Sequence, residues 1–288
     1  MEVAPVRAEG DEVLSPQAFE RLRLHPEFCA AVEDYCRASL DHYSRMTPVD
    51  RWLISDLGRQ SLSRGLVILD AVFGEVRARD IVESARVNRT CSRGRVMAYL
   101  QSCELNGMIS GPPARSAMDR VYQLEPRFID AMAPFTEITV RTVARLAPEA
   151  APAARAIDDP GYRRRFMVAL GKLAVSRRDL FAGPDMPVVL FLNRDGGERI
   201  MEQLIVSQSR DRGQMLGRAP VSRSSLARKA FTSRQHVRRL LEAGEAQGLL
   251  VVTSRSVAAS PHLSADIERH FALILEIARA AALRMQGA

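Results

Sequence analysis

The chain has 288 residues, 47% of them hydrophobic, and a formal net charge of +7. This length suffices for two domains with substantial cores, and the positive charge is compatible with a polyanionic partner. No apolar run approaches the roughly 18 residues of a membrane span, and the N-terminus lacks the basic and apolar regions of a signal peptide, so we expect a cytoplasmic protein without a membrane partner.

The beginning of the chain is expected to form a mobile arm followed by a series of helices. Residues 1–16 are acidic, contain proline and lack periodicity, which is typical of an arm. Apolar residues at near-helical spacing, interrupted by Pro26, then predict one or two helices. Pro48 opens a segment with a broad apolar face, and a helix around 79–86 and another after Cys91 complete a helical trio.

A wing and a linker follow these helices. Two short strands, 108–110 and 120–124, flank the Gly/Pro-rich tip GPPARSAMD, which carries Arg115. A helical stretch comes next, and its periodicity is then broken by an Ala/Pro-rich run at 147–158. This composition predicts a linker between two domains.

The elements before the linker return after it in the same order, which indicates an internal duplication. Residues 91–110 and 232–251 align without a gap, and each has a polar Ser-Arg start, a helix, a terminating Gly and a short apolar strand. The two stretches are identical at Ser92/Ser233, Arg93/Arg234, Val96/Val237, Leu100/Leu241, Glu104/Glu245 and Gly107/Gly248. Upstream, Pro48, Val49, Leu53, Asp56 and Gly58 match Pro187, Val188, Leu192, Asp195 and Gly197, with Trp52 opposite Phe191.

One segment of the second copy carries a family resemblance. Residues 225–251, SLARKAFTSRQHVRRLLEAGEAQGLLV, resemble the helix-turn-helix of winged-helix bacterial transcription regulators, with Val237 eleven residues after Leu226. The long helices that flank each unit are similar to those of the MarR family, although the first copy departs from the pattern by placing Ala85 where a leucine belongs. Proteins of that family are usually homodimers of about half this length, so the resemblance implies a covalent pseudo-dimer.

We therefore expect a mainly α fold with small β-wings, in which two winged helix-turn-helix domains form an intramolecular pseudo-two-fold dimer and the chain acts as a monomer. The expected domains are 17–146 and 159–288. They should pair through the helices around residues 25–45, 127–147, 160–182 and 262–285.

The helix after each Ser-Arg start is the candidate recognition helix. With Val237 and Leu241 turned inward, a 100° step per residue exposes Gln235, His236, Arg238, Arg239 and Glu242 in the second copy. The same step exposes a less basic set in the first copy, namely Gly94, Arg95, Met97, Ala98 and Gln101. The candidate DNA-binding residues are Arg89, Ser92, Arg93, Arg95, Arg115, Arg120, Arg223, Ser233, Arg234, Gln235, His236, Arg238, Arg239 and Arg255. A solvated charged face is the alternative interpretation.

These residues predict a nucleoid-associated, sequence-specific regulator that binds double-stranded DNA. Because the two helices differ, its site should be an imperfect palindrome whose half-site centres lie about 10 bp apart. The alternative is a winged-helix interaction scaffold in a transcription complex, with weak or no direct DNA readout, which the apolar Met97 and Ala98 would suit. RNA polymerase or another regulator is a further candidate partner, as is a small-molecule effector. Trp52 and Phe191 either fill matching cores or line such an effector pocket.

No enzyme, cofactor or metal site is expected. No nucleophile, base and orienting group stand at motif spacing, and four of the histidines, His25, His42, His262 and His270, lack metal-ligand spacing. The cysteines form no CxxC pair and should remain thiols in a reducing compartment. Two of them, Cys91 and Cys103, flank or occupy the first recognition helix, where oxidation would be one way to disturb DNA binding.

Overall fold

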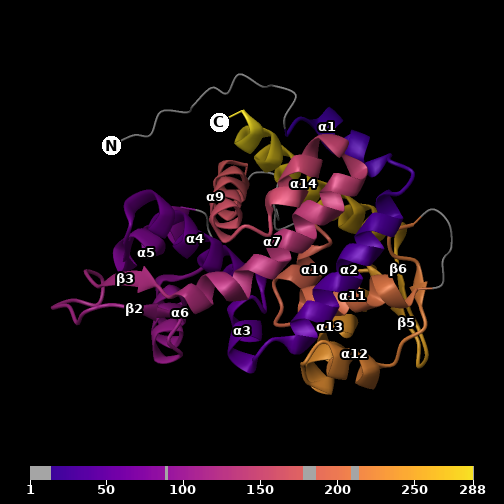
Figure 1. Ribbon diagram of the computed structural model, residues 1–288. Coiled ribbons are helices and arrows are strands. Elements are labelled where there is room, and N and C mark those ends of the chain that lie inside the picture. The colour runs from indigo at the N-terminus through magenta and orange to yellow at the C-terminus, as the bar shows by residue number, and fades with distance from the viewer. Residues whose placement is uncertain (1–13, 88–89, 178–185, 209–213, 288) are drawn as a thin grey trace.

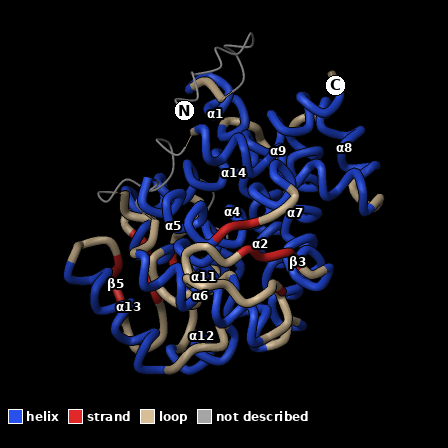
Figure 2. Tube along the Cα trace, turned by 90° about the vertical axis from the view of Figure 1, so that its left-hand side faces the viewer, coloured by secondary structure: helices blue, strands red, loops and turns tan. Residues whose placement is uncertain are grey.

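The computed structural model describes residues 14–87, 90–177, 186–208 and 214–287, which form mainly helices with two small antiparallel sheets (Figures 1 and 2). The expected fold class is thus found at this coarse level. Most of the predicted arm lies outside the described residues. Its last three residues belong to the fold, because Leu14 is buried and Ser15 caps a helix that begins at Pro16. No described helix is long and apolar enough to cross a membrane.

The two halves of the chain repeat one order of elements. After a short helix α1 (Pro16–Arg23), the first half contains α2 (Phe28–Arg45), α3 (Pro48–Leu53), α4 (Leu57–Phe73), β1 (Val76–Arg77), α5 (Ala78–Val87), α6 (Arg93–Leu105), β2 (Ile109–Ser110), β3 (Val121–Leu124) and α7 (Pro126–Leu146). The second half contains α9 (Pro160–Ser176), α10 (Val189–Leu192), α11 (Gly197–Ser207), β4 (Arg218–Ala219), α12 (Arg223–Lys229), α13 (Arg234–Ala246), β5 (Leu250–Val252), β6 (Val257–Ala259) and α14 (Pro261–Gln286).

The sheets repeat as well. Their strand orders are β1-β3-β2 and β4-β6-β5, so the last strand of each half lies in the middle of its sheet. The strand pairs β2–β3 and β5–β6 are the two predicted wings, whereas β1 and β4 had not been predicted. Each of these two additional strands has only two residues, too few for a period-two pattern to be visible in the sequence.

Local sequence explains where these helices begin and end. Proline occupies the first turn of α3, α7, α9 and α14, where its missing N–H is no loss because that group has no partner inside the helix. The helices α6 and α13 are each followed by a glycine with positive φ, Gly107 at 65° and Gly248 at 66°. Such a left-handed residue ends a helix and favours glycine, which has no Cβ to clash.

The long helices of the two halves pack reciprocally. Helix α2 of the first half contacts α11 of the second, and α9 of the second contacts α4 of the first. Within each half the first long helix also contacts the last, α2 with α7 and α9 with α14, and these two last helices contact each other. Figure 1 shows this helical layer above and between the two small sheets. The contacts of α2 with α11 and with α7 therefore have counterparts in those of α9 with α4 and with α14.

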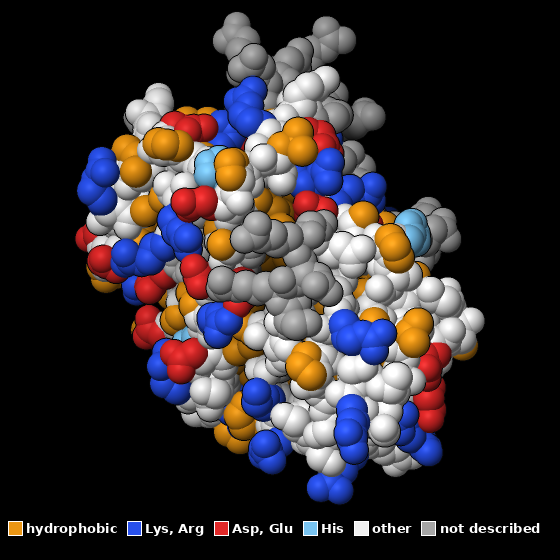
Figure 3. All heavy atoms as spheres, turned by 90° about the vertical axis from the view of Figure 1, so that its right-hand side faces the viewer, with side chains coloured by type: hydrophobic (Ala, Val, Ile, Leu, Met, Phe, Trp, Pro, Cys, Tyr) orange, Lys and Arg blue, Asp and Glu red, His pale blue; other side chains and the backbone are white. Residues whose placement is uncertain are grey.

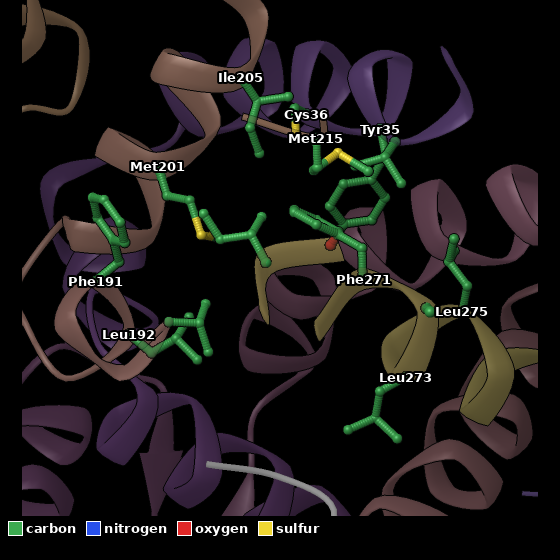
Figure 4. Packing of buried hydrophobic residues seen from close by; sticks show 14 of the residues in the cluster. Tyr35, Cys36, Phe191, Leu192, Met201, Ile205, Met215, Phe271, Leu273 and Leu275 are labelled. Carbon is green, nitrogen blue, oxygen red and sulfur yellow. The ribbon is translucent and has the colours of Figure 1, made fainter. Parts of the chain in front are cut away.

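Two hydrophobic cores lie beneath this layer. The smaller one lies mainly in the first half, where it includes Leu53, Leu66 and Tyr99, and it also contains Met167 of α9. The larger one fills the second half and continues through the helical layer to α1 and to a short helix, α8 (Ala151–Ala156). Figure 4 shows part of it, where Phe191 of α10 and Phe271 of α14 lie among side chains from several helices. Because the larger core includes residues of both halves, the halves are joined by packing as well as by the chain.

The secondary structure of the predicted linker, 147–158, differs from the expectation. A 3₁₀ turn at Pro148–Ala150 leads into helix α8 (Ala151–Ala156), and Ala153 and Ile157 are fully buried. The periodicity does break where expected, since α7 ends at Leu146. Alanine has the highest helix propensity and packs closely, and prolines in a first helical turn need no N–H partner, so an Ala/Pro-rich run can fold as a short buried helix.

A buried charged cluster lies between the halves. The Arg199 guanidinium on α11 pairs with Glu198 at 2.6 Å and with Glu202 at 2.8 Å, and it also donates to the Ser39 hydroxyl on α2. Burial raises the pKa of the Glu202 carboxyl to about 8 despite the nearby guanidinium. Burial also opposes ionisation of Glu198, but Arg199, His270 and Gln60 together outweigh it and lower the pKa of Glu198. Glu198 is therefore the principal anionic partner of Arg199 near neutral pH.

Candidate nucleic-acid interface

Helices α12 and α13 present the most basic surface among the candidate residues. Helix α13 begins after Ser233, whose hydroxyl accepts the backbone N–H of His236 at 3.0 Å and thereby caps the helix. Its buried residues are Val237, Leu240, Leu241 and Gly244, which form one stripe against the core. This stripe fixes the rotation of the helix, so that the arginines between the buried positions face outward.

The exposed basic side chains of these two helices are largely without acidic partners. Arg238 pairs with Glu242 at 3.6 Å, and both side chains are about half exposed. No ion pair is formed, within the described part of the chain, by Arg223, Arg228, Lys229, Arg234 or Arg239. Figure 3 shows Lys and Arg side chains along the lower end of this face of the molecule, where α12 lies. The surface therefore carries a positive charge that the protein itself does not neutralise.

The expected outward position of His236 is wrong. This side chain is half-buried, and its Nε2 atom is buried without a hydrogen-bond partner among the described residues. His236 lies one turn before Leu240 and two turns before Gly244, so it belongs to the edge of the buried stripe. Gln235, in contrast, is exposed as expected.

The corresponding surface of the first half is less basic because two of its arginines are already paired. The Arg95 side chain on α6 donates to the buried Asp56 carboxylate at 2.5 Å, and Arg120 at the base of the wing pairs with Glu104. Ser92 caps α6 as Ser233 caps α13. Arg93 is exposed and has no described ion-pair partner, whereas Arg89 lies outside the described residues.

Each wing carries an exposed arginine. Arg115 lies in the turn between β2 and β3, and Arg255 lies in the shorter turn between β5 and β6. The backbone N–H of Arg255 donates to the Thr253 hydroxyl at 3.3 Å, which holds this second turn tight. In Figure 1 the two wings lie at the left and right edges of the molecule, and α6 and α13 both lie in its lower part.

A polar link connects the surroundings of α6 and α13. Asp56, which holds Arg95, also pairs with Arg59 at 3.1 Å, and Arg59 in turn reaches Asp195 of the second half. The Ser55 hydroxyl donates to Asp195 at 2.6 Å. Burial opposes ionisation of Asp195, but Ser55 and Arg59 outweigh it and lower the pKa of Asp195. The loops that precede α4 and α11 are thus fixed to each other.

A cavity of about 120 Å³ lies within the helical layer and is lined by residues of α2, α4, α7, α9, α11 and α14. Its walls are mostly apolar. Two polar groups on it lack strong partners: Arg64 forms no ion pair with a described residue, and the buried Nε2 atom of His270 has no described hydrogen-bond partner. Burial lowers the pKa of His270, which keeps this imidazole neutral at physiological pH.

Neither aromatic residue considered for an effector pocket lines this cavity. Trp52 stacks on Tyr99 with the ring centroids 5.4 Å apart and borders a separate groove beside Phe231, and Phe191 is fully buried in the core. The sequence offered no signal for the cavity, because its lining comes from helices far apart in the chain. It likewise offered none for the partnership of Asp56 with Arg95, which lie 39 residues apart.

Cys91, just before α6, and Cys103, on α6, are shielded thiols. Cys103 is buried, and burial raises its pKa to about 12. Cys91 is half-buried, and burial raises its pKa as well. Since the thiolate is the reactive form, both environments disfavour oxidation.

The described residues contain no group of three His, Cys, Asp or Glu side chains that could hold a metal ion. Comparisons of the chain with protein-family models, with curated proteins and with solved structures found no match.

Proposed function

We propose that the protein is a sequence-specific regulator of transcription that binds double-stranded DNA through two winged helix-turn-helix units in one chain. The observation that carries this proposal is the exposed basic surface of α12 and α13, on which five of the six Lys and Arg side chains have no acidic partner within the described residues. Phosphate contacts dominate the affinity of such proteins, and an arginine fork is suited to guanine.

The duplicated architecture supports a pseudo-dimer. Both halves carry a capped helix followed by a strand pair, and the reciprocal contacts of α2 with α11 and of α9 with α4 are of the kind that a two-fold relation between two subunits gives. In this arrangement α6 and α13 enter successive major grooves, and the wing arginines Arg115 and Arg255 contact the flanking backbone or minor groove. The half-site centres are then about 10 bp apart.

The central cavity supports a role for a small-molecule effector. Its volume of about 120 Å³ approaches that of a ~150 Å³ apolar cavity that accepts benzene. An anionic substituent on such a ring would pair with Arg64 and hydrogen-bond to His270. A ligand that separates α4 from α14 would change the positions of the recognition helices, because both halves contribute to the cavity wall. Benzoate is the simplest probe, and Arg64→Ala should abolish the stabilisation against urea that it provides.

Salt dependence distinguishes direct DNA binding from the scaffold alternative. Affinity for duplex DNA should fall linearly on a log–log plot against salt, with a slope of roughly −0.9 per phosphate contact. Replacing Arg238 and Arg239 with alanine should make this slope shallower and weaken binding. The matched control is Arg155→Ala with Arg284→Ala, which removes two exposed charges from α8 and from the end of α14. Equal losses in both variants, or no DNA binding by the wild type, would favour the scaffold.

A further inference from the structure

The helices α6 and α13 correspond position by position. Both α6 and α13 have 13 residues and begin after a serine cap. Their buried residues occur at the same steps after that cap: Val96 and Val237, Tyr99 and Leu240, Leu100 and Leu241, Cys103 and Gly244. Because equivalent positions face the core, equivalent positions also face outward. Any difference between the outward residues is therefore a difference in what the two helices present to DNA.

Two outward pairs differ in chemistry in a consistent direction. Ala98 on α6 corresponds to Arg239 on α13, and Gln101 corresponds to Glu242. All four side chains are exposed. The two positions are three residues apart, so they lie on adjacent turns of one helix face and can reach neighbouring base pairs.

These side chains suit different bases. The methyl group of alanine contacts the methyl group of thymine, and glutamine forms two hydrogen bonds with adenine. Arginine forms two hydrogen bonds with guanine, and glutamate accepts a hydrogen bond from the amino group of cytosine. The first pair of residues thus suits A·T base pairs, and the second pair suits G·C base pairs.

We propose that the two half-sites of the DNA differ in base composition. Ala98 and Gln101 read A·T pairs in one half-site, and Arg239 and Glu242 read G·C pairs at the equivalent positions of the other. This inference rests on the proposed function and specifies its DNA target. Arg95 does not read bases in this scheme, because the buried Asp56 carboxylate holds its guanidinium at 2.5 Å. The pair of Glu242 with Arg238 is looser, at 3.6 Å between two exposed side chains, and leaves Glu242 able to turn to a base.

The first helix is also shaped for close approach to DNA. Gly94 is exposed in the first turn of α6, and a Cβ atom at this position would meet nothing within 4 Å. The small Gly94 and Ala98 leave the backbone near the groove surface, where the short reach of an alanine methyl suffices. The exposed Arg93 and Arg115 supply the phosphate contacts that base readout by an uncharged face requires.

The test is selection of binding sites from a random duplex library with the full-length protein. The wild type should enrich sites with one G·C-containing and one A·T-containing half. The variant Ala98→Arg with Gln101→Glu carries the side chains of α13 on α6, and it should enrich two similar G·C-containing halves. The reciprocal variant, Arg239→Ala with Glu242→Gln, should enrich A·T at both. Each lost base contact should weaken binding to the wild-type site by about 5- to 150-fold.

The outcomes separate this inference from the proposed function. Enrichment of two identical halves by the wild type, or an unchanged site in the Ala98→Arg, Gln101→Glu variant, would overturn the difference between the half-sites while leaving a DNA-binding regulator in place. A wild type that enriches no sequence would overturn both. All four positions are on exposed helix faces, and unchanged urea unfolding of the variants verifies that they fold.

Discussion

Replacement of Arg199 by alanine tests whether the buried charged cluster between the two halves stabilises the fold. The guanidinium is buried on α11, pairs with Glu198 and Glu202, and donates to Ser39 on α2 of the other half. The rings of Tyr43 and Phe135 lie beside it, with their centroids 5.3 and 5.6 Å from the guanidinium carbon. The variant therefore leaves buried acidic groups without their cation and removes a hydrogen bond between the halves.

The expected loss follows from burial. Removing one partner of a buried ion pair destabilises a protein by about 3–5 kcal/mol, because the remaining charge is left unpaired. In the variant Glu198 keeps the amide of Gln60, at 2.6 Å, as a hydrogen-bond donor, which does not neutralise its charge. The expected loss is a large part of the ~5–15 kcal/mol that stabilises a typical protein. A double variant that adds Glu198→Gln should recover much of the loss.

Urea unfolding at pH 7 measures these differences. The control is Arg141→Ala, which breaks an exposed ion pair with Asp158 in which the side chains are 51% and 72% exposed. Exposed pairs of this kind contribute about 0–1 kcal/mol. A loss below 1 kcal/mol in Arg199→Ala, or a double variant no more stable than the single one, would refute the assignment of a stabilising buried cluster.

Three further predictions concern pH, helix caps and DNA contacts. Burial raises the pKa of Glu202 in the folded protein to about 8 from an ordinary 4.5, so the protonated carboxyl stabilises the fold fully below pH 4.5 and this stabilisation is lost as the pH rises to 8. Glu202→Gln should remove this part of the pH dependence of the free energy of unfolding, measured with urea. Ser92→Ala and Ser233→Ala should each lower the free energy of unfolding by about 1 kcal/mol, measured in the same way, and no loss would contradict the capping. Fluorescence anisotropy with the selected duplex measures the DNA contacts. Arg239→Ala should weaken binding by about 5- to 150-fold. Arg95→Ala should weaken binding less, because the buried Asp56 carboxylate already holds the Arg95 guanidinium.

The sequence predicted those elements whose signals are local. Ser92 and Ser233 mark helix starts, Gly107 and Gly248 mark helix ends, and the apolar residues between them recur at helical spacing. Repetition of this pattern predicted that the same order of elements would occur twice. The strand pair of the first copy was also predicted from local sequence, because two short apolar segments flank a turn rich in glycine and proline.

Features that depend on distant partners could not be predicted in this way. The arginine at position 95 fitted a DNA-facing position, but only the fold shows that Asp56 holds it. Arg199 and Glu202 are charged residues that sequence patterns place on a surface, and they are buried because they meet each other and α2. The segment 147–158 has the composition of a linker, and its burial between α7 and α14 depends on helices outside it.

The central claim is that this protein reads DNA sequence through α13. It is tested most directly by incubating the purified protein with sheared genomic DNA from its source, recovering the bound fragments and sequencing them, with the Arg238→Ala, Arg239→Ala variant in parallel and the Arg155→Ala, Arg284→Ala variant as the control. We predict sharp peaks for the wild type and the control and their loss in the first variant. Peaks that persist in that variant, or a wild type that recovers no fragments above background, would contradict the claim.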